Sequence, residues 1–267
     1  MAERRIARTG KGIVFACGAS GDQNFLGRRW LASLVENSPD RLRERMALRL
    51  LSFSPHCFYH NDIHAEAERL RRSRRILAET IVSPYISKNA RVTDYGCGPG
   101  YLARAVAERA AHVDAVDISR GVLACARALN GRADIRYLTP AELLQAAGHA
   151  DLAYSFAVAQ HMRADALAAA LSLLASKIRR GGTLLLHFAV PGRQGWRTEA
   201  DWEADRSVAC RPKLRYGLNC SGRPASEMES LAAASGFTDV AVQSLGGSPV
   251  AGDDDILGQH LLTARRR

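Results

Sequence analysis

The chain has 267 residues, of which 47% are hydrophobic and 6% aromatic. This length suffices for one sizeable hydrophobic core, or for one core with a small cap. No apolar run reaches the roughly 18–20 residues of a membrane-spanning helix, and Met1–Arg5 lacks the apolar segment of a signal peptide. The six cysteines are irregularly spaced without a C-x-x-C pair. We therefore expect a cytoplasmic protein with reduced thiols and no membrane partner.

The formal net charge is +10, and the excess lies mainly in residues 1–90, where 16 Lys and Arg face 9 Asp and Glu. A nucleic acid or a nucleotide sugar is one partner that such a charge attracts. Solvated helix faces are the alternative. We favour the second interpretation because the sequence has no lysine-rich tract and no basic patch interleaved with aromatics.

The first part of the chain predicts helices. Residues 1–21 surround a short apolar run with glycines and indicate an arm or an irregular loop. Apolar residues at helical spacing then predict helices over 23–36, 40–52 and about 62–82, with Asn61 or Asp62 as the N-cap of the last. We interpret residues 1–89 as a helical cap or lid.

From residue 90 the pattern alternates between strand and helix. The predicted strands are 90–95, 111–117, 135–138, 152–157, 183–189, 237–245 and about 256–264, and the predicted helices are 100–109, 119–129, 141–147, 164–179 and 226–235. A capping box of Ser226 and Glu229 is expected to begin the last helix. The pattern predicts an α/β fold, with a doubly wound, mostly parallel seven-stranded sheet whose last strand is antiparallel, over residues 90–267.

Residues 190–223 interrupt this alternation with many glycines and prolines and with Trp196, Trp202 and Tyr216. A long loop inside a compact domain is usually functional. We therefore expect an insertion there on the side where a substrate binds.

A glycine-rich turn follows the first predicted strand. It reads Asp94-Tyr95-Gly96-Cys97-Gly98-Pro99-Gly100-Tyr101, and its glycines let a ligand approach the backbone at the start of a helix. Dinucleotide folds use G-x-G-x-x-G, whereas this turn is G-x-G-x-G with a carboxylate two residues before it. Asp94 would repel a pyrophosphate and suits a cation instead. Asp117, at the tip of the next strand, can accept both hydroxyls of a ribose.

These residues resemble the class I S-adenosylmethionine-dependent methyltransferases. The resemblance covers roughly residues 75–190 by motif. Within this range, Asp151–Phe156 matches the family's fourth-strand motif, and Arg179–Thr183 matches the turn before the fifth strand. It implies S-adenosyl-L-methionine as the cofactor. The implied cofactor-binding residues are Asp94, Gly96, Cys97, Gly98, Gly100, Tyr101, Asp117, Ile118, Pro140, Ala141, Ser155 and Phe156.

The segment after the third strand departs from the family. An acidic residue often stands there near the adenine amine, and Glu142 is the nearest candidate. We favour an ordinary charge at a helix N-terminus for Glu142. The adenine contact would then fall to Thr139 or to the backbone of Pro140 and Ala141.

The methyl acceptor needs positioning and, if it is a hydroxyl, a base. His161, after the fourth strand, is the candidate base, with a packing or capping histidine as the alternative. The candidate acceptor-binding residues are Tyr59, His60, His187, Trp196, Trp202 and Tyr216. His187 also suits a buried structural role. His56, His60 and His64 recur every four residues, but Pro55 and Asn61 argue against one continuous helix, so we expect no metal site.

The favoured function is methyl transfer to a small molecule or a glycan, at a hydroxyl group. Residues 155–158 lack the Pro-Pro-aromatic motif of adenine-N6 and cytosine-N4 methyltransferases and the cysteine of cytosine-C5 enzymes. One alternative is an RNA or protein methyltransferase that uses the arginine-rich N-terminal region. Others are a non-catalytic cofactor-binding homologue and an oxidoreductase. The sequence leaves the oligomeric state open, a homodimer included.

Overall fold

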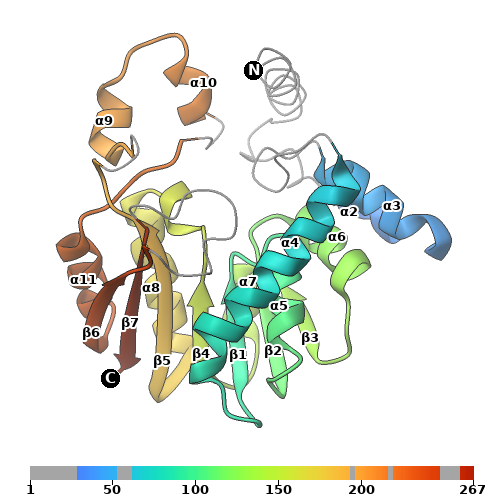
Figure 1. Ribbon diagram of the computed structural model, residues 1–267, viewed down its shortest axis with the longest axis horizontal. Coiled ribbons are helices and arrows are strands. Elements are labelled where there is room, and N and C mark those ends of the chain that lie inside the picture. The colour runs from blue at the N-terminus through green and yellow to red at the C-terminus, as the bar shows by residue number, and fades with distance from the viewer. Residues whose placement is uncertain (1–28, 53–61, 193–195, 216–218, 247–258) are drawn as a thin grey trace.

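A computed structural model describes residues 29–52, 62–192, 196–215, 219–246 and 259–267. One seven-stranded sheet with the strand order β3-β2-β1-β4-β5-β7-β6 forms its centre (Figure 1). The strands are β1 Arg91–Tyr95, β2 His112–Val116, β3 Ile135–Leu138, β4 Ala150–Ser155, β5 Ile178–Ala189, β6 Phe237–Ser244 and β7 Gln259–Arg266. The first five are parallel, whereas β7 runs antiparallel to both of its neighbours. The expected fold class is confirmed.

Two strand boundaries differ from the prediction. β4 ends at Ser155 rather than at residue 157, because Ala157 adopts a φ of +59° that a strand does not allow. β5 begins five residues early, at Ile178, because Ile178 already pairs with Ala150 of β4. The glycine turn at residues 181 and 182 is therefore an irregularity within β5.

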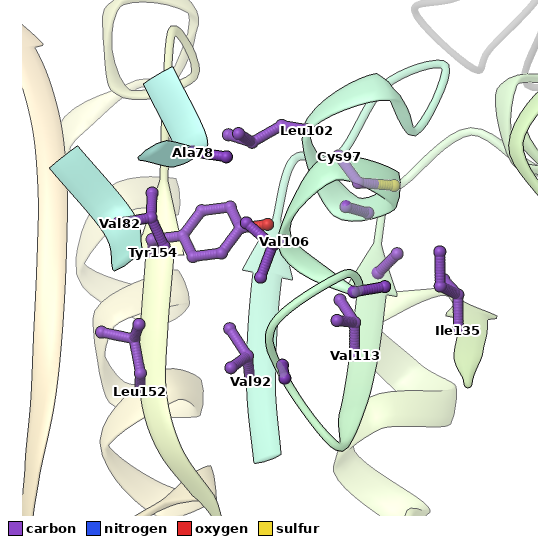
Figure 2. Packing of buried hydrophobic residues seen from close by; sticks show 14 of the residues in the cluster. Ala78, Val82, Val92, Cys97, Leu102, Val106, Val113, Ile135, Leu152 and Tyr154 are labelled. Atoms are coloured by element: carbon purple, nitrogen blue, oxygen red, sulfur yellow. The ribbon is translucent and has the colours of Figure 1, made fainter. Parts of the chain in front are cut away.

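Helices cover both faces of the sheet. α5 (Tyr101–Val106) and α6 (Arg120–Asn130) lie on one face, and α7 (Pro140–Gln145), α8 (Ala164–Lys177) and α11 (Ala225–Ala234) lie on the other. The face that α5 and α6 cover has its own hydrophobic core, called the first core below. In Figure 2 the fully buried ring of Tyr154 from β4 lies in this core between Val82 and Val106. Both faces thus bury apolar side chains, as a doubly wound sheet requires.

Within the described residues, three α-helices precede the sheet. α2 (Arg29–Glu36) and α3 (Asp40–Leu51) pack on α6, and α4 (Ile63–Leu77) packs on α5 (Figure 1). Asp62 caps α4 by accepting bonds from the backbone of His64 and Ala65, as expected. The predicted helical extent to residue 82 is confirmed, but its last residues, Ala78–Val82, form a π-helix, and a 3-10 turn follows at Ser83–Tyr85. The division of the chain at residue 89 stays a prediction.

Two expectations near the carboxyl-terminal part need correction. Residues 190–223 are not one loop, since they contain α9 (Glu199–Ala204) and α10 (Cys210–Arg215). α9 begins with a capping box between Thr198 and Asp201. α11 lacks the expected cap, because it begins at Ala225 after Pro224 and so places Ser226 inside the helix. None of the described helices is long and apolar enough to cross a bilayer.

Candidate active site

The glycine turn folds back over the end of β2. Gly96, Gly98 and Gly100 have φ values of +81°, +52° and +82°, the left-handed region that favours glycine. A Cβ on Gly96 would lie 2.2 Å from a methyl of Val158, and one on Gly100 would lie 2.6 Å from the Tyr137 hydroxyl. A Cβ on Gly98 would meet no described atom within 4 Å. Gly98 therefore faces the space that a ligand can enter.

Asp117 lies directly against this turn. Its Oδ2 accepts a hydrogen bond from the Gly98 amide at 3.1 Å, and its Oδ1 accepts one from the Ser119 amide at 2.9 Å. Burial raises the pKa of Asp117, and the two amides oppose that rise. The next residue, Ile118, leaves 75% of its surface exposed, although it is a large apolar residue. A carboxylate and an exposed apolar side chain thus lie side by side at the end of β2.

Asp94 is buried at the end of β1. Burial raises the pKa of Asp94 to about 7, and the nearby Tyr154 hydroxyl opposes that rise. Neither Asp94 Oδ2 nor the Tyr154 hydroxyl has a hydrogen bond of normal geometry within the described residues, so their contact is weak. Arg74 of α4 also favours the charged form. A buried, poorly satisfied carboxylate is ready to receive a cation.

The end of β3 carries a capping box. Glu142 Oε2 accepts bonds from the amide and the hydroxyl of Thr139 at 2.7 and 2.9 Å, and its Oε1 accepts one from Arg120. Glu142 is therefore the helix-terminal charge that we favoured, and Thr139 is occupied by the same cap. Pro140 is half-buried and Ala141 is exposed, so both remain candidates for the adenine contact.

His187 and Phe156 form one unit at the ends of β4 and β5. Their rings stack with centroids 5.6 Å apart, and the Ala157 amide donates to His187 Nδ1 at 3.1 Å. Burial lowers the pKa of His187 to about 4. His187 is therefore a neutral, buried histidine that holds the loop after β4. Its predicted contact with the acceptor stays a prediction, as does a cofactor contact for Ser155, which is buried beside it.

His161 ends a 3-10 turn at Ala159–His161 and is half-buried. Burial lowers the pKa of its imidazole, against a hydrogen bond to the Asn219 backbone. Its Nδ1 lies 3.6 Å from Sγ of Cys220. The imidazole is consequently neutral near pH 7, the form in which a histidine accepts a proton.

The insertion supplies the other predicted aromatic residues. Trp202 of α9 donates from Nε1 to the Cys220 carbonyl at 2.8 Å and lies under the Arg197 guanidinium. Trp196 is half-buried. Trp202 thus anchors the insertion, and an acceptor contact for either tryptophan stays a prediction. The predicted residues Tyr59, His60 and Tyr216 lie outside the described residues.

The structure brings other predicted residues only partly to the site. The Tyr101 ring is buried in the cluster between α2, α3, α4 and α6, beneath Arg71, so its backbone is the part that lies at the turn. Cys97 is buried in the first core, and its amide, like that of Gly96, donates to the Val116 carbonyl.

Sequence reasoning missed Cys220 and Arg223. Both lie about 60 residues from the side chains or carbonyls that they contact, His161 and Met162, so no local pattern marks them. The sequence Thr198-Glu199-Ala200-Asp201 did carry a capping signal that would have located α9.

These features fit S-adenosylmethionine. The open side of Gly98 admits a ligand, the unsatisfied Oδ2 of Asp94 suits its cationic amino acid part, and Asp117 beside Ile118 suits a ribose next to an adenine. A pyrophosphate would meet two carboxylates instead, the buried Asp94 and the half-buried Asp117.

Comparisons with known proteins agree with this geometry. Residues 92–182 match the family model described as a methyltransferase domain. A comparison with curated protein sequences gives no match.

Three similar solved structures illustrate the likeness. The magnesium protoporphyrin IX methyltransferase of Synechocystis with bound S-adenosylhomocysteine is 19% identical, with a TM-score of 0.50 over 78% of this chain and 88% of that one. Human N-acetylserotonin methyltransferase with S-adenosylmethionine is 15% identical, with a TM-score of 0.51 over 89% and 59%. Phosphoethanolamine N-methyltransferase 2 of Haemonchus contortus with S-adenosylmethionine is 15% identical, with a TM-score of 0.50 over 71% and 52%.

The present chain thus spans about half the length of the Haemonchus enzyme. At these identities the solved structures establish the fold alone, and the family model establishes a methyltransferase domain over residues 92–182. Residues 92–182 thus carry a methyltransferase domain, and the chain has the fold of the class I S-adenosylmethionine-dependent methyltransferases.

Proposed function

We propose that the enzyme methylates a hydroxyl group of a small molecule or a glycan. The observation that carries the proposal is the neutral, half-buried His161 in the 3-10 turn after β4, with the insertion packed against it. S-adenosylmethionine supplies an electrophilic methyl group on its sulfonium. A hydroxyl acceptor must lose its proton as the new bond to carbon forms, and a neutral imidazole can take it.

The other residues act by positioning. Asp94, Gly98 and Asp117 would hold the cofactor at the ends of β1 and β2. α9 and α10 lie beyond the ends of the strands next to β4 (Figure 1). They would wall the space in which the acceptor meets the methyl group, and orientation in such a space supplies most of the rate.

The described N-terminal helices give less support to an RNA or protein acceptor. Several of their arginines are paired with carboxylates of the same region. The pairs include Arg43–Asp40, Arg69–Glu66, Arg71–Glu68 and Arg71–Glu44. Polymer binding through phosphates would favour unpaired cations.

A radiolabelled methyl-transfer screen tests the proposal. The full chain is incubated with methyl-labelled S-adenosylmethionine and with small-molecule, glycan, RNA and protein fractions of a cell extract. We expect label in a small-molecule or glycan fraction, in a methyl ether that resists mild base. We expect His161→Gln to lose about 10²–10⁴-fold in rate.

The matched control is His149→Gln, which changes an exposed histidine outside the site and should keep the wild-type rate. Label confined to RNA or protein would contradict the acceptor class. Full activity of His161→Gln would remove His161 as the base.

A further inference from the structure

Two segments far apart in the sequence run side by side at the candidate base. The Ser221 amide donates to the Gln160 carbonyl at 2.7 Å, and Arg223 Nη2 donates to the Met162 carbonyl at 2.9 Å. Both neighbours of His161 are therefore bonded to the insertion. This register places Cys220 opposite His161, with Sγ 3.6 Å from Nδ1.

The backbone of this segment is held independently of the Cys220 thiol. The Cys220 carbonyl accepts the Trp202 indole bond at 2.8 Å, and the Gly222 amide donates to the Arg197 carbonyl at 2.8 Å. The Arg223 guanidinium, only 4% exposed, pairs with Glu199 at 2.8 Å. These contacts hold the backbone of residues 220–223 in place, and they thereby position the Cys220 thiol next to the His161 imidazole.

The partner at one ring nitrogen decides what the other can do. A neutral imidazole has one donor and one acceptor nitrogen, and a fixed neighbour selects the tautomer and the plane of the ring. His161 has two such neighbours, the Cys220 thiol at Nδ1 and the Asn219 backbone, to which the imidazole is also hydrogen-bonded. We propose that Cys220 is a positioning residue whose thiol, held against Nδ1, acts together with the Asn219 backbone to select the tautomer and orientation of His161 in the acceptor site. The value of this orientation for methyl transfer rests on the proposed function, whereas the orientation itself does not.

The test reads the tautomer directly. The full chain is labelled with ¹⁵N-histidine and observed by long-range ¹H–¹⁵N correlation across pH 5–9, and His161→Gln assigns the signal. We expect wild-type His161 to show two widely separated ring-nitrogen shifts, which mark a single tautomer. Cys220→Ala should bring the two shifts closer together, because only the Asn219 backbone then favours one tautomer. Cys220→Ser, which retains a hydrogen-bonding group, should restore part of the separation.

Cys210→Ala is the matched control. Cys210 is the other described thiol of the insertion, and it contacts the Trp202 carbonyl rather than His161, so its removal should leave the His161 shifts unchanged. Mixed tautomers in the wild type would overturn the proposal, as would unchanged His161 shifts in Cys220→Ala. If Cys220→Ala does not fold, Cys220→Val replaces it in the test. Altered His161 shifts in folded Cys220→Val would then support the proposal, and unchanged shifts would contradict it.

This outcome is separable from the outcome of the methyl-transfer screen. An enzyme without methyl-transfer activity but with a single His161 tautomer would contradict the proposed function alone. An active enzyme whose His161 shifts do not change in Cys220→Ala would contradict the positioning role alone.

Discussion

At the scale of single residues, folding and cofactor binding favour different protonation states of Asp94. Its pKa is about 7 in the folded chain against 3.8 for the ordinary group. Below about pH 4 Asp94 is protonated in both the folded and the unfolded state, and its protonation then contributes fully to the free energy of unfolding. As the pH rises toward 7 the unfolded state ionises first, so the free energy of unfolding falls. A bound cation reverses this preference by favouring the carboxylate.

The affinity for S-adenosylmethionine should therefore depend on pH. Binding to the protonated form must release one proton, so lowering the pH from 8 to 6 should raise Kd about tenfold. Isothermal titration at both pH values measures this change. Asp94→Asn should show no such dependence, and a flat profile in the wild type would contradict the assignment of Asp94.

Asp94→Asn should also raise stability while it weakens binding. An amide of the same shape needs no buried charge, so we expect a higher Tm than the wild type without cofactor at pH 8 and a smaller rise on adding cofactor. Asp134→Asn serves as the control, because that carboxylate is paired with Arg132 and its loss should not raise the Tm. A less stable Asp94→Asn chain would argue against this view of the site.

The glycines of the turn differ in what a methyl group would meet. Gly98→Ala should lower the free energy of unfolding by only about 1 kcal/mol, the cost of a left-handed φ, because its Cβ meets open space. It should nevertheless raise the Kd for the cofactor. Gly100→Ala, whose Cβ collides with Tyr137, should destabilise the fold more. Urea denaturation with cofactor titration distinguishes the two, and equal effects on both variants would be the contrary result.

At the scale of elements, the insertion is fastened at its base. Arg223, next to α11, bonds Glu199 of α9, Glu227 of α11 and the Met162 carbonyl before α8. Glu199 also accepts the first free amide of α8, from Ala164, at 3.0 Å. The Arg223 guanidinium and the Glu199 carboxylate therefore connect α8, α9 and α11.

Removing one partner of this buried pair should be costly. We expect Arg223→Met to lower the free energy of unfolding by about 3 kcal/mol, since two carboxylates lose their shared cation. Arg163→Met is the matched control, because it also removes a cation near Glu199, but the Arg163 side chain is 69% exposed and lies 3.9 Å from that carboxylate. Its effect should stay within about 0.5 kcal/mol. Similar urea midpoints for both variants would show that the insertion is not anchored in this way.

At the scale of the whole molecule, local patterns predicted the sheet well. β3 matches its prediction at both ends, and Asp62 caps α4 where its side chain suggested. Motif spacing also placed Asp117 at the carboxyl end of β2, where it directly follows Val116, because the strand–turn–helix unit repeats a known geometry. The hydrogen bond between Asp117 and the Gly98 amide came only from the structure. These features depend on interactions within one or two adjacent elements.

The errors occur where tertiary contacts override local preference. The extension of β5 depends on Ala150, the end of β4 on the backbone of Ala157, and the surroundings of His161 on Cys220. Glycines and prolines in residues 190–223 suggested a loop, although the Thr198 cap and packing on Arg223 support helices there. No pattern within a single segment encodes those pairings.

The cofactor preference of the whole chain is the broadest prediction. A ligand that binds only the folded state at 100 times its Kd stabilises it by about 2.7 kcal/mol. For a chain of this size we expect a Tm rise of roughly 5–10 °C with S-adenosylmethionine or S-adenosylhomocysteine. NAD and NADP should produce no rise, because their pyrophosphates would face Asp94 and Asp117. Asp117→Ala should abolish the rise with both sulfur ligands and keep the unliganded fold. Equal stabilisation by NAD, or an undiminished rise in Asp117→Ala, would mean that the turn holds its ligand through other groups than these two carboxylates.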